Sequence, residues 1–233
     1  MNDRVQTFGR SAGYGQGISA QQRNKVLRNT YWLLALSMLP TVLGAWIGVT
    51  TGITASLGGG MGLMVFLGGA FGFMYAIEKT KNSAAGVPVL LAFTFFMGLM
   101  LSRIIAMVLG FKNGADLIMM AFGGTAGVFF VMASLATVIK RDLSSMGKWL
   151  TVGAVVLMVA AIINVFVASS AGMMAISVLA IGIFSAFMLY DLKRIMDGGE
   201  TNYISATLGL YLSIYNVFQS LLMLLGIGGG NSD

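Results

Sequence analysis

Long apolar runs alternate with short polar breaks along the chain. Each run approaches the ~20 residues that a helix needs to cross a hydrocarbon core. The apolar residues follow one another continuously, whereas the strands of a membrane barrel alternate between apolar and polar positions over ~10 residues. The pattern therefore predicts an all-α membrane protein with seven spans, placed at residues 31–49, 57–77, 87–109, 117–139, 149–168, 173–190 and 203–226.

The two ends of the chain differ from these runs. Residues 1–29 hold five basic residues against Asp3 alone, and their low hydrophobicity predicts a disordered basic tail. They contain no basic stretch followed at once by an apolar core, so we expect a retained N-terminus rather than a secretory signal. The predicted organisation is this tail, a seven-helix transmembrane domain over residues 30–227 and a short external tail over residues 228–233.

Basic residues gather in alternate breaks. Twelve of the 14 Lys and Arg residues lie in the first segment and in the second, fourth and sixth breaks, whereas the breaks on the other side hold only Lys112. Membrane proteins concentrate Lys and Arg in their cytoplasmic loops. The N-terminus is therefore predicted to be cytoplasmic and, after seven spans, the C-terminus to lie outside. The twelve residues are Arg4, Arg10, Arg23, Lys25, Arg28, Lys79, Lys81, Lys140, Arg141, Lys148, Lys193 and Arg194.

Composition excludes a soluble enzyme. Hydrophobic residues make up 57% of the 233 residues and charged residues only 9%, where a soluble domain carries about 25% charged residues. The sequence has no Cys and no His, which removes disulfides, thiolate chemistry, Cys/His metal sites and imidazole catalysis. A net charge of +6 suggests nucleic acid in a soluble protein, but basic cytoplasmic loops account for it here. We therefore expect a bilayer partner, and no enzyme activity, cofactor, bound metal or nucleic acid.

Pairs of small residues recur at a spacing of four within the runs. Such a pair lies on one helix face and lets another backbone approach closely. The preferred interpretation is helix packing inside one bundle, and dimerisation of two copies is the alternative. The pairs are Gly44 with Gly48, Gly68 with Gly72, Gly123 with Gly127, and Gly182 with Ala186.

Polar residues inside the runs are the candidates for function. The last predicted helix carries several polar residues, which indicate either hydrogen bonds between helices or a polar permeation path; they are Thr207, Tyr211, Ser213, Tyr215, Asn216, Gln219 and Ser220. Ser213, Asn216 and Ser220 share one face of this helix. Arg103 lies within the third run, where its side chain either reaches the outer interface or pairs with a carboxylate. Asp191 ends the sixth run. It is either a solvated loop carboxylate paired with Lys193 or Arg194, or a titratable plug and cation ligand at the mouth of the bundle.

The last third of the chain resembles a known family. The stretch from Met188 to Gly226, with Leu189-Tyr190-Asp191 and Leu210-Tyr211-Leu212-Ser213 inside it, is similar to the Bax inhibitor-1 family of seven-span membrane proteins. The segments NKVLRNTY at 24–31 and GGETNYI at 198–204 look like its bacterial YccA branch. The resemblance extends over residues 24–227.

This resemblance implies a fold, a location and two activities. It implies six helices that surround a central C-terminal helix in the bacterial inner membrane, with a periplasmic C-terminus. The YccA branch modulates the membrane AAA protease FtsH and is itself a poorly degraded substrate. Such a protease must first grip an unstructured segment, so the predicted tail with Arg23, Lys25 and Arg28 becomes a candidate engagement segment. The alternative is that the tail only sets the orientation of the protein through its charges. Other members leak calcium ions in a pH-dependent way, which is the alternative function.

One position departs from the calcium-leak members. Those members carry two aspartates that share a proton and close the pore. Asp191 matches the first aspartate, but Ser213 stands where the second would be. A carboxylate and a hydroxyl do not repel each other as two carboxylates do. We therefore expect this chain to lack the sharp pH switch, as in the YccA branch, which also has serine here.

The distribution of basic residues yields a test of topology. Reporter fusions after residue 83 and after residue 145 should report the cytoplasm, and a fusion at residue 231 should report the outside. The measurement is paired alkaline phosphatase and fluorescent-protein activity in intact cells. A cytoplasmic reporter at residue 231 would show that the number of spans is even.

Overall fold

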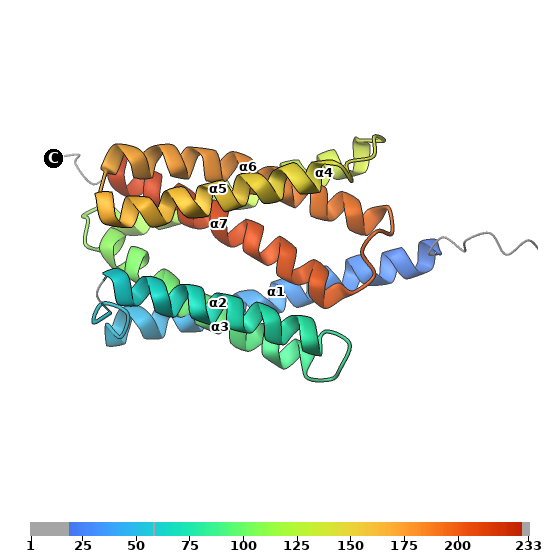
Figure 1. The fold of residues 1–233 in the computed structure, drawn as a ribbon, viewed down its shortest axis with the longest axis horizontal. Helices are drawn as coiled ribbons and strands as arrows, with labels where there is room; N and C mark the ends of the chain where they lie inside the picture. Colours follow the sequence, from blue (N-terminus) through green and yellow to red (C-terminus); the bar gives the residue numbers. More distant parts are fainter. Residues whose placement is uncertain (1–18, 58, 230–233) are drawn as a thin grey trace, which may run out of the picture.

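A computed structural model describes residues 19–57 and 59–229, which fold into seven α-helices (Figure 1). Each helix is long and apolar enough to cross a membrane. The prediction of an all-α protein with seven spans is confirmed for this part of the chain. The helices are α1 (Ala20–Thr51), α2 (Gly59–Thr80), α3 (Gly86–Leu109), α4 (Gly114–Val138), α5 (Met146–Val167), α6 (Ser170–Met196) and α7 (Tyr203–Gly229).

The first six helices form two groups of three, and α7 crosses between them (Figure 1). In one group α1 and α2 pack against α3, and in the other α4 and α5 pack against α6. Helix α7 contacts α1, α2 and α3 on one side and α4 and α6 on the other. Helix α5 packs on α6 rather than on α7. The predicted ring of six helices around the seventh is therefore not found in that form, because α5 forms an outer layer.

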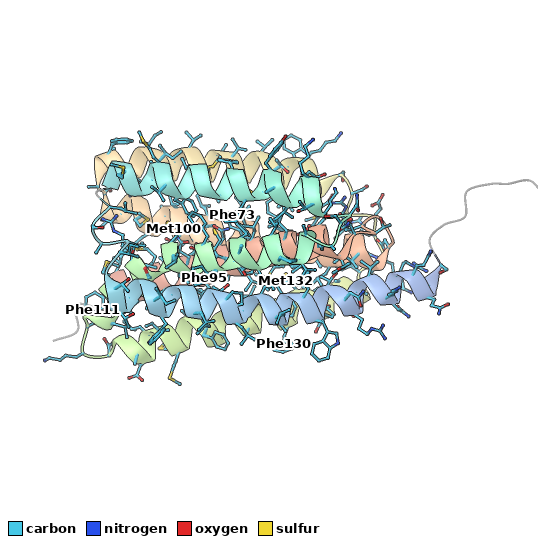
Figure 2. The ribbon with its side chains drawn as sticks, turned by 90° about the horizontal axis from the view of Figure 1, so that it is seen from below. Phe73, Phe95, Met100, Phe111, Phe130 and Met132 are labelled. Carbon is cyan, nitrogen blue, oxygen red and sulfur yellow. The ribbon has the colours of Figure 1, made fainter. Side chains whose placement is uncertain are left out.

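Burial separates α7 from the peripheral helices. No residue of α7 between Tyr203 and Ile227 is exposed. By contrast, large apolar side chains such as Met64 of α2 and Phe166 of α5 are 74% and 76% exposed. Phe130 of α4 likewise lies at the outer edge of the bundle (Figure 2). Apolar surface of this extent is expected where lipid, not water, is the surrounding solvent.

Helices α1 and α3 approach each other so closely that their backbones are in contact. A Cβ atom on Gly44 would overlap the carbonyl of Phe95, and one on Gly98 would overlap the carbonyl of Thr41. A Cβ on Gly48 would meet the side chain of Ser102. These glycines let the two backbones touch, which is how small residues drive association where the hydrophobic effect is absent. Packing within the bundle is confirmed for the pair Gly44 and Gly48.

The same prediction is wrong for the other pairs. Gly68 and Gly72 on α2, and Gly123 and Gly127 on α4, are exposed, and a Cβ atom on any of them would meet nothing within 4 Å. Gly182 is in the same situation. A spacing of four places two residues on one face of a helix, but it does not say whether that face is turned toward the bundle or toward lipid.

Helix α1 begins earlier than the apolar pattern predicts. Ser19 and Gln22 form a capping box, in which the amide of Gln22 donates to Ser19 Oγ at 3.2 Å and the amide of Ser19 donates to Gln22 Oε1 at 3.1 Å. The predicted disordered tail is therefore wrong for residues 20–29, which are helical. The rest of that prediction, residues 1–18, lies outside the described residues. At the other end α7 continues to Gly229, so the predicted external tail is helical over residues 228–229, and residues 230–233 are likewise not described.

The start of α1 and the α2–α3, α4–α5 and α6–α7 connections lie at one end of the bundle (Figure 1). Contacts between them support this placement, because Arg23 bonds to Met196 and Asn202 bonds to Asn82. We call this the basic end, since it carries the Lys and Arg residues of these segments. The α1–α2, α3–α4 and α5–α6 connections lie at the other end (Figure 1), so the basic segments share one end as the distribution of Lys and Arg predicted. Which side of a membrane the basic end faces stays a prediction.

The α1–α3 contact predicts which glycines matter for stability. Gly44→Ala and Gly98→Ala should lower the free energy of unfolding by about 1–3 kcal/mol, because a methyl group would push the two backbones apart. Gly68→Ala and Gly123→Ala are matched controls that should leave it unchanged or slightly higher, since alanine is the better helix former. Denaturant unfolding of the purified protein in detergent measures the difference. Equal effects at all four positions would contradict the assigned contact.

Candidate functional site at the α6–α7 junction

The candidate site lies where α6 and α7 face each other near the basic end. Helix α6 continues past the predicted end of its span to Met196, so Asp191 is a helical residue and not a loop residue. Its carboxylate lies against the backbone of α7, where a Cβ atom on Gly209 would be 2.9 Å from Asp191 Oδ2. Glycine at this position therefore makes room for the carboxylate, and any larger side chain would displace it.

Asp191 is partly buried, and its carboxylate makes no hydrogen bond or ion pair with the described residues. The charged groups that act on it are Arg194 and Glu200. These two are paired with each other, with Arg194 Nη2 at 3.2 Å from Glu200 Oε2. The interpretation of Asp191 as a carboxylate neutralised by Lys193 or Arg194 does not hold, because Lys193 pairs with Asp197 at 2.7 Å.

Ser213 lies one helical turn beyond Gly209 on the same face of α7, and Asn216 and Ser220 continue this face. Ser213 is 3% exposed and Ser220 is 9% exposed. Asn216 donates from Nδ2 to the carbonyl of Leu212 in its own helix at 2.8 Å. In the described part of the chain, the side chains of this face make no hydrogen bond to another helix, so the predicted interhelical hydrogen bonds come from the other polar residues of α7.

Those hydrogen bonds come from the opposite face of α7. Tyr211 Oη lies 2.9 Å from Thr41 Oγ1 of α1, and Tyr215 Oη donates to the carbonyl of Met97 in α3 at 3.2 Å. Thr207 Oγ1 donates to the carbonyl of Thr30 in α1 at 3.4 Å. Helix α7 is thus hydrogen-bonded to α1 and α3. Its contact with α6 places Asp191 against the face of α7 that carries Gly209 and Ser213.

The α6–α7 connection is built from the segment GGETN at 198–202. Gly198 takes a positive φ of 82° that L side chains rarely adopt, which ends α6. Glu200 Oε1 accepts from the amide of Asn202 at 2.9 Å. Asn202 Oδ1 then caps α7 by accepting from the amide of Ile204 at 2.9 Å, and its Nδ2 donates to the carbonyl of Lys81 at 3.0 Å. This segment therefore joins α6, α7 and the α2–α3 connection.

A cavity of about 320 Å³ opens beside this connection, between the end of α6 and the α4–α5 connection. Asp142 lies at its wall. Its pKa is lowered because the amide and the hydroxyl of Ser144 both donate to the carboxylate and Lys193 is near. The cavity is thus lined by two acidic and two basic side chains. The lining residues are Asp142, Leu143, Ser144, Tyr190, Lys193, Arg194, Asp197 and Gly199.

Arg103 is separate from this site. It is exposed, and its Nη1 donates to the carbonyl of Leu57 in the α1–α2 connection at 3.3 Å. No carboxylate pairs with it in the described part of the chain. Of the two interpretations, the structure favours a side chain that reaches the end of the bundle opposite the basic end.

The three basic residues assigned to the tail lie on the first turns of α1. Arg23 is partly buried, and its Nη1 donates to the carbonyl of Met196 at 3.3 Å. Lys25 and Arg28 are exposed. The structure thus brings Arg23 to the α6–α7 junction and leaves the other two on the surface.

Chemically, the site offers the carboxylate of Asp191, the carboxylate of Glu200 paired with Arg194, and several hydroxyls. Within the described residues, no three or more His, Cys, Asp or Glu side chains are grouped so that they could hold a metal ion. Two residues of the site were missed by sequence reasoning. Asn202 carried a signal, since an asparagine directly before an apolar run is a helix cap. Gly209 carried none, because its importance depends on the neighbouring helix.

Comparison with known proteins agrees with this architecture. Residues 23–230 match the family described as inhibitor of apoptosis-promoting Bax1. The chain is 40% identical over 203 residues to the modulator of FtsH protease YccA of Escherichia coli, which covers 87% of this chain and 90% of YccA. It is 39% identical over 214 residues to an uncharacterised protein of Pseudomonas aeruginosa, covering 91% of this chain and 94% of that protein.

A second Escherichia coli relative with the same identity is named as the inner membrane protein YccA. An uncharacterised Neisseria meningitidis protein is 37% identical over 89% of this chain and 93% of its own length. The family match extends from the first turn of α1 to the end of α7, so it includes every described helix. The chain therefore belongs to the Bax1-inhibitor family, as its C-terminal motif suggested, and is a multi-pass membrane protein of the YccA type.

Proposed function

We propose that this protein is a regulatory protein of the bacterial inner membrane that modulates proteolysis by an FtsH-type AAA protease. The observation that carries the proposal is its 40% identity, over 87% of the chain, to a protein named as modulator of FtsH protease.

The basic end is the side on which such a protease would act. Basic loops favour the cytoplasm, and the catalytic machinery of an AAA protease works on the cytoplasmic side in this proposal. The polar segment of residues 1–18 precedes α1 at this end. Fully extended, 18 residues reach at most ~60 Å. This reach is enough to enter a protease pore close to the membrane.

Extraction beyond this segment would be slow. Each helix pulled from the bilayer exposes its apolar surface to water. Helix α7 packs on both three-helix groups and is hydrogen-bonded to α1 and α3 through Thr207, Tyr211 and Tyr215. The helices therefore resist extraction from the bilayer together rather than one by one. A substrate that is easily engaged and slowly extracted would occupy the protease and slow its turnover of other membrane proteins.

A deletion of residues 2–18 tests the engagement step. This deletion keeps Ser19, which caps α1, and the basic residues Arg23, Lys25 and Arg28 that favour the same orientation. The shortened protein should have a longer half-life in cells with an active protease, because the protease has lost the segment it grips. A pulse-chase measurement in cells with and without the protease gives the difference.

The control removes residues 230–233, which follow α7 at the opposite end of the bundle. This variant should be degraded at the wild-type rate. Correct insertion of both variants is checked with the reporter fusion after residue 145. An unchanged half-life for the correctly inserted N-terminal deletion would remove residues 2–18 from the mechanism.

A cation leak is the second candidate function, with calcium as the permeant ion. The observation in its favour is the place of Asp191, which makes no hydrogen bond or ion pair with the described residues and lies against Gly209, one helical turn before Ser213 on α7. This is the pair of positions at which other family members are expected to carry two aspartates. With Ser213 present, we propose that any leak lacks a sharp acid-linked transition.

A substitution at Ser213 tests this alternative. Ser213→Asp should create a pH-dependent change in calcium flux, because two adjacent carboxylates resist ionising together. Arg194 and Glu200 are the other charged groups that act at this place. Ser213→Asn is the matched control, since it has nearly the same size and no charge. Flux into liposomes measured between pH 5 and 8 that is identical for both variants would refute the gating role.

A further inference from the structure

The first turns of α1 are docked on the bundle by one face. Arg23, Val26, Leu27 and Thr30 lie at spacings of three and four and therefore share this face. Val26 and Leu27 pack against the main hydrophobic core, and Thr30 is fully buried. The opposite face, which carries Lys25 and Arg28, is exposed. This part of α1 is thus an amphipathic extension that is held by the bundle at the basic end.

Arg23 is the polar anchor of this docked face. The amides that follow α6 bond to the carbonyls of Lys193, Arg194 and Ile195, which leaves the carbonyl of Met196 for another donor. Arg23 Nη1 supplies that donor at 3.3 Å. A cation at the C-terminus of a helix also interacts favourably with the helix dipole. The contact therefore caps α6 and ties it to α1, which belong to different three-helix groups.

The same end of α6 is tied to the rest of the basic end. Arg194 bonds to Glu200, whose carboxylate also accepts from the amides of Thr201 and Asn202. Asn202 in turn donates to the α2–α3 connection, to the carbonyl of Lys81 and to Asn82 Oδ1. A connected set of polar contacts thus runs from Arg23 through the α6–α7 connection to the α2–α3 connection.

We propose that the Arg23–Met196 contact is a latch that holds the first turns of α1 on the α6–α7 connection, and that its opening limits how fast a protease pulling from the N-terminus begins to unfold the protein. The second part rests on the proposed function. A force applied to the N-terminus reaches residues 20–30 before any other described segment. These turns must leave their docking face before α1 can be drawn out of the bundle, so the latch sets the first barrier to degradation.

Three single substitutions test the latch. Arg23→Ala, Lys25→Ala and Arg28→Ala each remove one positive charge from the same helix end, and all three place alanine, the best helix former, in a helix. Only Arg23→Ala removes a contact with α6. Hydrogen exchange of the purified proteins in lipid nanodiscs, without any protease, should show faster exchange at the amides of residues 24–30 for Arg23→Ala alone, by up to about tenfold.

The three proteins are then compared by pulse-chase in cells with and without the protease. Only where the protease is active, Arg23→Ala should be degraded several times faster than wild type and than Lys25→Ala and Arg28→Ala, because these two variants keep the Arg23–Met196 contact. Unchanged exchange in Arg23→Ala would overturn the latch itself. Faster exchange with an unchanged half-life would overturn its control of degradation. Wild-type degradation that does not depend on the protease would instead refute the proposed function, whatever the exchange data show.

Discussion

The architecture depends on one constraint, which is that a polar last helix must be kept out of lipid. Helix α7 carries Thr207, Tyr211, Ser213, Asn216 and Ser220, and polar groups that face hydrocarbon are costly. Two three-helix groups meet this constraint by covering α7 from both sides. The tight α1–α3 crossing, the tyrosine hydrogen bonds to that pair and the outward apolar faces of α2 and α5 all follow from this arrangement.

The two faces of α7 have different roles. The tyrosine face is bonded to α1 and α3, whereas the Ser213 face meets the carboxylate of Asp191 across Gly209. At the basic end, the GGETN segment at 198–202 joins α6, α7 and the α2–α3 connection. Arg23 connects α1 to the end of α6. One of the two segments that look like the YccA branch, residues 198–204, therefore also connects the elements of this end.

Much of the fold could be predicted from the sequence, because an apolar run of sufficient length has few alternatives to a membrane helix. The start of α1 was missed, since the Ser19–Gln22 capping pair and a docked amphipathic face extend the helix beyond its apolar run. Gly68 and Gly123 were assigned to packing because spacing identifies a shared face and not the neighbour of that face. The contact of Asp191 with Gly209 and that of Arg23 with Met196 join residues 18 and 173 positions apart, and no local pattern encodes them.

The central claim is that this protein occupies an FtsH-type protease as a slowly extracted substrate. The most direct measurement places the purified protein and the purified protease together in liposomes with a second, easily degraded membrane substrate. The account predicts that degradation of the second substrate slows as this protein is added, and that the inhibition weakens when residues 2–18 are absent. Degradation of the second substrate at an unchanged rate, at protein concentrations far above that of the protease, would contradict the account.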